Sequence, residues 1–90
     1  MTEIKWSILK NERLKRTRGV SFEEILGARL IGVKKHPARK NQRIMLFKHK
    51  GYVWIVPYII EGDCIFLKTL FPSRKYTREY IGRESSDEKY

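Results

Sequence analysis

The spacing of apolar residues in this 90-residue chain changes near residue 43, and this change constrains the fold more than any other feature. Three blocks rich in β-branched, aromatic and other apolar residues span 43–49, 52–60 and 64–71. Blocks of this length and composition are typical of β-strands. The breaks between them, Lys50-Gly51 and Glu61-Gly62-Asp63, are short enough for hairpin turns. The pattern therefore predicts a three-stranded antiparallel meander over residues 43–71.

Pro57 lies in the middle of the second block. Proline has no backbone N–H to donate to a sheet ladder. In sheets it is found at edges and bulges rather than in central ladder positions. We therefore expect an edge or a bulge where Pro57 lies.

Before residue 43 the signals are those of helices. Ser7 is a candidate N-cap for a helix that runs to about Thr17, and Gly19 supplies its stop. The residues before Ser7, Ile4-Lys5-Trp6, form either a short strand or a simple lead-in.

A second helix is predicted to begin at Ser21. The sequence Ser21-Phe22-Glu23-Glu24 is a capping box, in which the serine caps the helix and Glu24 reaches back to the Ser21 amide. Apolar side chains then fall at helical spacing on one face. They are Phe22, Ile25, Leu26 and Leu30. This pattern predicts a helix that ends at Gly32, followed by a basic loop over 33–42.

These elements together predict an α+β fold. Two N-terminal helices would pack on one face of a small antiparallel sheet of three to four strands, leaving the other face and its rim to bind a partner. Ser73 would cap a short C-terminal helix over residues 74–81. We expect residues 1–81 to form a single domain and residues 82–90 a polar tail.

Charge points to the kind of partner. Twenty Lys and Arg against ten Asp and Glu give a formal net charge of +10. Seven basic residues and no acid lie between Lys34 and Lys50, and four more and no acid lie between Cys64 and Arg78. A folded domain with such one-signed stretches is typical of nucleic-acid binding.

Other classes of site receive little support from the sequence. The one cysteine, Cys64, permits neither an internal disulfide nor a cysteine-based metal set. No carboxylate pair with ligand-like spacing occurs in the basic regions, so we expect no metal and no cofactor. The chain lacks a signal-peptide pattern and a long apolar run, which predicts a cytoplasmic protein without a membrane partner.

The candidate site residues come from the basic stretches. Arg74 and Lys75 follow the predicted cap Ser73, where the helix dipole prefers anions, and such a violation tends to mark a functional site. Free amides and two cations there would form a phosphate cradle. Lys68 interrupts an apolar strand. The predicted catalytic set is Arg74, Lys75, Lys68 and His49, and the predicted RNA-binding set is Arg43, Lys48, Arg78, Lys34, Lys35 and Tyr76.

Both histidines can titrate near neutral pH. His49 ends the first strand of the meander, and His36 lies in the basic loop. A single histidine is more often structural or solvated, and only His49 enters the predicted catalytic set.

Two stretches of the sequence resemble the BrnT toxins, a branch of the RelE/ParE-like ribonuclease toxins. The first contains Trp6-Ser7, Lys10-Asn11 and Arg18-Gly19-Val20-Ser21-Phe22-Glu23-Glu24. The second is Ser73-Arg74-Lys75 with Thr77, which is similar to the family's Ala-Arg-Lys-Ala-Thr motif. The sequence departs from the family pattern at Ser7, where the family usually has Asp, and at Arg18, where it usually has His. In the last strand it offers only Lys68 or Thr69 where the family tends to carry an arginine.

The resemblance implies a RelE-like fold and an RNA-cleaving toxin of a type II toxin–antitoxin system. It also implies an antitoxin partner, often of the ribbon-helix-helix type, and active-site roles for Arg74 and Lys75. The substrate would be RNA, in particular mRNA, free or on the ribosome.

Two other readings stay open. A non-catalytic RNA-binding or regulatory module needs the same Arg and Lys residues, because binding and cleaving a phosphate both require cations. A protein-interaction module would use the same basic face for an acidic partner.

Overall fold

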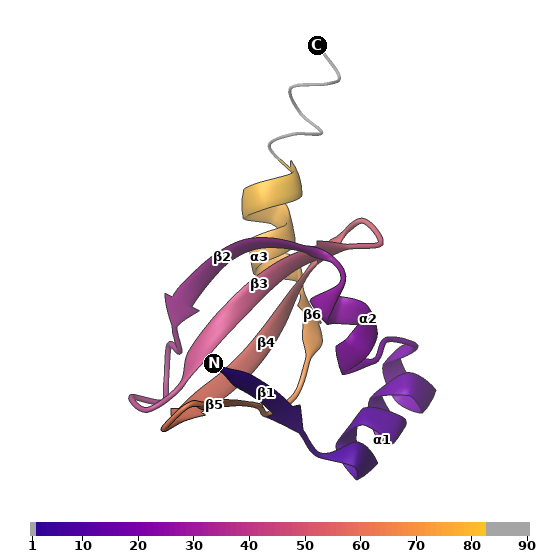
Figure 1. Cartoon of the computed structure of the whole chain (residues 1–90). Coiled ribbons are helices and arrows are strands. Elements are labelled where there is room, and N and C mark those ends of the chain that lie inside the picture. Colours follow the sequence, from indigo (N-terminus) through magenta and orange to yellow (C-terminus); the bar gives the residue numbers. More distant parts are fainter. Residues whose placement is uncertain (1, 83–90) are drawn as a thin grey trace.

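A single mixed β-sheet forms the centre of the structure, a computed structural model that describes residues 2–82 (Figure 1). Its strands are β1 (Glu3–Trp6), β2 (Arg29–Lys35), β3 (Arg43–His49), β4 (Tyr52–Glu61), β5 (Cys64–Leu67) and β6 (Phe71–Ser73). The strand order is β1-β5-β4-β3-β2, and β6 pairs with the first part of β4. Only β1 and β5 pair in parallel among the described strands. The predicted tail lies, beyond Gly82, outside the described residues.

The helices are short and lie on two sides of the sheet. They are α1 (Ile8–Arg18), α2 (Phe22–Leu26), α3 (Arg74–Thr77) and the π-helical turn η1 (Arg78–Gly82). Figure 1 shows α1 and α2 side by side and α3 at the far end of the sheet. None of the helices within residues 2–82 is long and apolar enough to cross a membrane.

The predicted architecture of two N-terminal helices on a small antiparallel sheet of three to four strands is wrong. The sheet has six strands and is mixed, and α2 is a five-residue helix that ends at Leu26. Residues 29–35 are strand β2, in which Leu30 pairs with Phe47 of β3. Ile31 and Val33, which are β-branched, favour a strand over a helix here. The predicted helix end, Gly32, lies instead at a β-bulge.

The predicted caps are present. The Ser7 Oγ accepts a hydrogen bond from the Lys10 N–H at 3.2 Å, and α1 ends at Gly19 with a φ of 71°. The Ser21 Oγ accepts from the Glu24 N–H at 3.0 Å. The reciprocal half of the capping box is not formed, because the Glu24 carboxylate contacts His49 and Lys50 instead.

The predicted meander is present as β3, β4 and β5. Lys50 and Gly51 have φ values of 52° and 80°, and positive values at both positions are typical of a type I′ hairpin turn. The third strand is interrupted. Tyr58 of β4 pairs with Leu67, and Ile55 pairs with Phe71. Two residues of β4 lie between these pairs, but three residues lie between Leu67 and Phe71, so one extra residue forms a bulge between β5 and β6.

Pro57 explains why the ladder tolerates this bulge. The Pro57 carbonyl accepts from the Lys68 N–H at 2.8 Å, so the backbone of Pro57 points toward the β5–β6 side. The N–H and C=O of one residue in an antiparallel strand point to the same side. The donor that Pro57 lacks would therefore have faced the bulge, and the pairing of β4 with β3 is intact.

Both faces of the sheet are packed, each by different helices. On the first face, α1 and α2 cover a core that includes Leu14, Phe22, Ile25, Phe47 and Val56. Complete burial of one such side chain contributes roughly 1.5–3 kcal/mol. On the second face, Tyr76, Tyr80 and Ile81 pack against Ile44, Leu46, Val53 and Ile55. The expectation of a fully open second face is therefore wrong, because α3 and η1 cover one end of it.

Candidate nucleic-acid interface

The uncovered part of the second face contains three adjoining hollows, which we call the trough. The first, of about 660 Å³, is lined by Arg39, Lys40, Asn41, Gln42, Ile59, Ile60, Glu61 and Lys68. The second, of about 450 Å³, is lined by His36, Arg39, Gln42, Pro57, Lys68, Thr69 and Phe71. The third, of about 290 Å³, is lined by His36, Pro37, Ile44, Ile55, Pro57, Phe71, Ser73, Lys75 and Tyr76. Neighbouring hollows share lining residues, so the trough is continuous.

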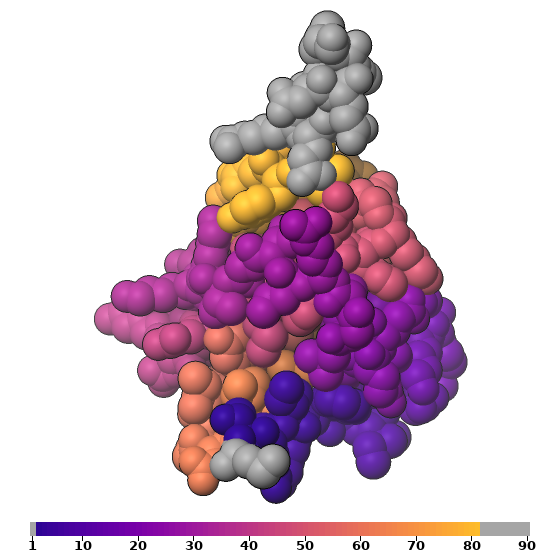
Figure 2. Space-filling view, turned by 45° about the horizontal axis from the view of Figure 1, so that its top comes forward, coloured from indigo at the N-terminus to yellow at the C-terminus, as the bar shows by residue number. Residues whose placement is uncertain are grey.

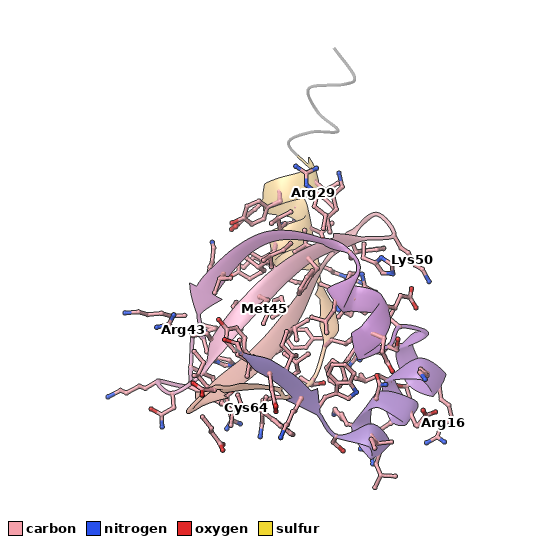
Figure 3. All side chains as sticks on the ribbon, viewed as in Figure 1. Arg16, Arg29, Arg43, Met45, Lys50 and Cys64 are labelled. Atoms are coloured by element: carbon pink, nitrogen blue, oxygen red, sulfur yellow. The ribbon has the colours of Figure 1, made fainter. Side chains whose placement is uncertain are left out.

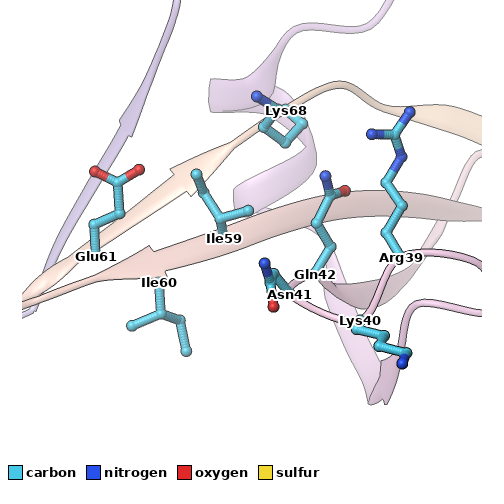
Figure 4. Close-up of a pocket in the computed structure, with 8 residues that line it drawn as sticks. All are labelled: Arg39, Lys40, Asn41, Gln42, Ile59, Ile60, Glu61 and Lys68. Carbon is cyan, nitrogen blue, oxygen red and sulfur yellow. The ribbon is translucent and has the colours of Figure 1, made fainter.

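Strand alternation and one loop place these side chains together. Side chains on a strand alternate between faces, so Lys68 shares the second face with Phe66 and not with Leu67. Figure 4 shows Lys68, Gln42 and Arg39 projecting to the same side of the strands as Ile59, whereas Ile60 points away. Arg39 and Gln42 belong to the loop 36–42, which projects from the side of the molecule (Figure 2). The two acid-free stretches of the sequence therefore meet at the trough.

The trough is strongly cationic. Arg39, Lys40, Lys68 and Lys75 line it, and all four are exposed. Glu61 is the one carboxylate among the described residues that line it, and it lies in the first hollow. A concave surface with one sign of charge concentrates the opposite charge from solution. The trough therefore suits a polyanion.

His36 lies in the middle of the trough with a fixed ring. Its Nδ1 accepts hydrogen bonds from the backbone N–H groups of Ala38 and Arg39, both at 3.0 Å. With Nδ1 used as an acceptor, the neutral ring carries its proton on Nε2. His36 is therefore suited to donate a hydrogen bond from Nε2.

Of the predicted catalytic residues, Lys68 and Lys75 line the trough. Arg74 is exposed at the start of α3 and is not among the lining residues of the trough. The predicted cap is present, since the Ser73 Oγ accepts from the Tyr76 N–H at 3.1 Å. That bond occupies one amide of the predicted phosphate cradle, and the four residues of α3 give it a small dipole.

His49 lies on the other face of the sheet. Its side chain is on the same face of β3 as those of Met45 and Phe47, which belong to the first core. Its Nε2 lies 2.6 Å from the Glu24 Oε2 of α2. The Trp54 Nε1–H donates to the His49 carbonyl at 3.0 Å. The hydrogen bond with His49, followed by that with Lys50, holds the pKa of Glu24 below its usual value of 4.5. The structure thus separates His49 from Lys68 and Lys75.

The predicted RNA-binding residues are dispersed. Tyr76 lines the trough, and the Lys34 Nζ lies 5.0 Å from its ring centroid and 5.6 Å from that of Tyr80. A hydrogen bond with Tyr80 raises the pKa of Lys34. Lys34 therefore fastens α3 and η1 to β2.

None of the other four predicted RNA-binding residues lines the three hollows of the trough. Lys35 and Arg43 line a further hollow beside the loop 36–42, which shares His36, Arg39, Lys40 and Gln42 with the trough. Figure 3 shows Arg43 and Lys50 at opposite ends of the sheet. Lys48 is half-buried on β3, and Arg78 is exposed at the start of η1.

The sequence analysis did not place Arg39, Lys40 or His36 in the candidate site. It also did not predict that the His36 ring is fixed by its Nδ1 hydrogen bonds. The available signal was the acid-free loop around His36-Pro37. Charge alone did not indicate that this loop lies beside Lys68, because that position depends on the pairing of β2 with β3.

Comparison with known proteins gives a structural likeness. No protein-family model and no curated protein sequence matches the chain. Among solved structures, the crystal structure of the Brucella abortus ribonuclease toxin BrnT matches with a TM-score of 0.55. The match covers 81% of this chain and 97% of that chain at 15% sequence identity. The fold is therefore BrnT-like, as the resemblance of the sequence predicted.

Proposed function

We propose that this chain is the toxin of a type II toxin–antitoxin pair and that it cleaves RNA, in particular mRNA, in the cytoplasm. A fold like that of a ribonuclease toxin supports the proposal. The observation that carries it is the trough, where cations from two separate stretches of the sequence line one concave surface. The toxin would be a single domain that spans residues 1–81.

The proposed reaction is attack by the RNA 2′-hydroxyl on the adjacent phosphorus. The 2′-oxygen forms a new bond to phosphorus and gives its proton to water, while the bond from phosphorus to the 5′-oxygen breaks and that oxygen takes a proton from water. The products are a 2′,3′-cyclic phosphate and a free 5′-hydroxyl. This route requires no metal. Within residues 2–82, no three metal-ligating side chains come together.

In this proposal the trough residues stabilise charge. Arg39 and Lys68 hold the phosphate oxygens, on which negative charge gathers as the 2′-oxygen attacks. The Nε2–H of His36 donates a further hydrogen bond to the same oxygens, because its Nδ1 is held by two amides. Removing one such donor typically slows a reaction about 10²–10³-fold. Lys75 continues the cationic path, and Arg74 remains a proposed contact at the start of α3.

We propose a protein antitoxin, of the ribbon-helix-helix type, as the partner. Apart from the basic trough, the chain offers an exposed apolar pair at the start of α1. Ile8 and Leu9 are 76% and 81% exposed. Adjacent large apolar side chains in water favour contact with another protein.

A second candidate function is a non-catalytic RNA-binding module. One observation favours it: the histidine in the trough has its Nδ1 occupied, and the nearby Lys and Arg side chains are cations at neutral pH. Such a surface binds phosphate readily, and Glu61, in the first hollow, is the one carboxylate among its described lining residues that could accept a proton.

The deciding experiment is induction of the chain alone in a bacterial culture, with growth and total RNA followed over time. We expect growth arrest and RNA breakdown with the unaltered chain. Lys68→Gln should relieve both, and Arg74→Ala tests the contact at α3. Arg16→Gln, on the exposed side of α1 (Figure 3), removes the same charge away from the trough and should leave toxicity unchanged. Healthy growth and intact RNA with a folded, unaltered chain would favour the binding module.

A further inference from the structure

The third hollow of the trough differs in character from the other two. Ile44 and Ile55, which are 2% and 7% exposed, form its apolar floor together with the buried Pro57. Three of its lining residues carry flat aromatic rings: His36, Phe71 and Tyr76. Its volume of about 290 Å³ can hold a flat heterocycle the size of a nucleobase.

Tyr76 is fixed in position on one wall of this hollow. Lys34 and Lys75 place their Nζ atoms 5.0 Å and 5.6 Å from its ring centroid. Its backbone N–H donates to the Ser73 Oγ. Contacts with cations and a capped helix start therefore hold the wall in place before any ligand arrives, which lowers the entropy cost of binding.

Charge indicates what would enter the hollow. Through His36, Pro57 and Phe71 the third hollow adjoins the second, where Arg39 and Lys68 lie. Lys75 stands at its other side. An uncharged apolar ligand would gain no favourable interaction from these cations. A nucleotide, by contrast, has a flat base for the apolar hollow and a phosphate for the cations beside it.

We propose that the third hollow is a base pocket, which takes one unpaired nucleobase of a single-stranded RNA while the adjacent phosphates lie along Arg39 and Lys68. The proposal rests on the proposed function in taking RNA as the ligand, but it does not require cleavage. Paired bases cannot enter, because their faces and edges are engaged within the duplex. The pocket makes the chain selective for single strands.

The test measures binding with RNA that cannot be cleaved. The probe is a fluorescein-labelled uridine octamer with 2′-O-methyl groups, which lack the attacking hydroxyl. Its reference is an octamer of the same backbone in which every base is replaced by hydrogen. Fluorescence anisotropy gives both dissociation constants. We expect the uridine octamer to bind about fivefold or more tightly than the abasic octamer, since stacking one base contributes at least this much.

Two variants and one control locate the effect. Phe71→Leu keeps an apolar side chain but removes a ring, and it should bring the ratio of the two constants close to one. His36→Ala should lower the same ratio. Because His36 lies in a loop, this variant replaces Phe71→Leu as the test if Phe71→Leu does not fold. Lys68→Gln should weaken both octamers equally and leave the ratio unchanged, because it lies on the phosphate path.

The outcomes separate this proposal from the proposed function. If the unaltered chain binds both octamers equally, there is no base pocket, although the RNA-binding trough stands. A ratio unaffected by Phe71→Leu and His36→Ala would also overturn the pocket. If neither octamer binds, both the pocket and the proposed function fail.

Discussion

Asn11 is the buried polar residue that joins the two N-terminal helices. It is 4% exposed, and its Oδ1 accepts from the Phe22 N–H at 2.8 Å. Its Nδ2 donates to the Glu23 Oε1 at 2.6 Å, and this bond is the first cause of the lowered pKa of Glu23. The Phe22 N–H is one of the amides that a helix start leaves without a partner. Asn11 and the Phe22-Glu23 pair, which belong to the BrnT-like stretch of the sequence, therefore have structural roles.

Replacing Asn11 with Ala should destabilise the fold by about 1–3 kcal/mol, because the buried Phe22 N–H would lose its acceptor. Urea denaturation followed by tryptophan fluorescence measures the change. Arg13→Ala, at an exposed position of the same helix, should stay within about 0.5 kcal/mol of the unaltered chain. Equal effects of the two substitutions would show that the Asn11 hydrogen bonds are unimportant.

Glu24 gives the fold a defined dependence on pH. Its pKa is lowered, first by the hydrogen bond with His49, so its contribution is present above its usual pKa of 4.5. That contribution is lost as the pH falls through the lower pKa of the folded state. We expect Glu24→Gln to lower the melting temperature at about pH 6 and to have a smaller effect at about pH 3. A melting-temperature difference that does not shrink in acid would contradict this role of Glu24.

At the scale of elements, the sequence correctly predicted the features that depend on contacts between residues close in the chain. Ser7, Gly19 and Ser21 set helix ends through contacts within a few residues, and these positions were found. The two strands around Lys50-Gly51 were found because a turn holds them together. The parallel pairing of β1 with β5 joins Glu3 to Cys64, and no local pattern encodes such a contact.

Strand β2 illustrates the opposite case. Leu30 of β2 fits the helical spacing that begins at Phe22, and the capping box at Ser21 reinforced the wrong interpretation. The helix ends at Leu26 because the backbone of Arg29–Lys35 gains a ladder with β3 along its length, apart from the bulge between Leu30 and Gly32. Tertiary pairing therefore overrode a weak local preference.

The glycines that end α1 and α2 provide a matched pair for testing this local chemistry. Gly19 has a φ of 71°, which disfavours a side chain, whereas Gly27 is in the right-handed helical region. Gly19→Ala should cost about 1–2 kcal/mol through backbone strain. A Cβ on Gly27 would meet its nearest atom at 3.5 Å, an ordinary contact, so Gly27→Ala should be neutral or stabilise by up to about 1 kcal/mol. Thermal denaturation of both variants measures the difference, and a reversed order would contradict it.

At the scale of the whole molecule, the sequence identified part of the candidate site. Lys68 and Lys75 could be predicted because a charge breaks a local rule at each position. His49 was misplaced, because the face that a strand residue occupies depends on the register of the sheet and here turns it toward Glu24. His36 and Arg39 reach the trough through a loop whose direction follows from β2, which the sequence did not reveal.

Net charge does not locate the proposed RNA-binding surface, because the molecule is basic on both sides. Helix α1, on the first face, exposes Arg13 and Arg16, while the trough exposes Lys68 and Lys75. These two pairs allow a comparison at equal charge. Only residues that contact phosphates release counterions when RNA binds.

The double variant Lys68→Gln/Lys75→Gln should therefore weaken binding of the uridine octamer and change its salt dependence. For single strands the slope of log K against log salt concentration is about −0.7 per phosphate contact, so losing two contacts should make it shallower by about 1.4. Arg13→Gln/Arg16→Gln removes the same charge from α1 and should leave the slope unchanged. Anisotropy titrations at several salt concentrations measure both slopes. If the two double variants change the slope equally, RNA responds to the charge of the whole molecule, and the trough is not its binding surface.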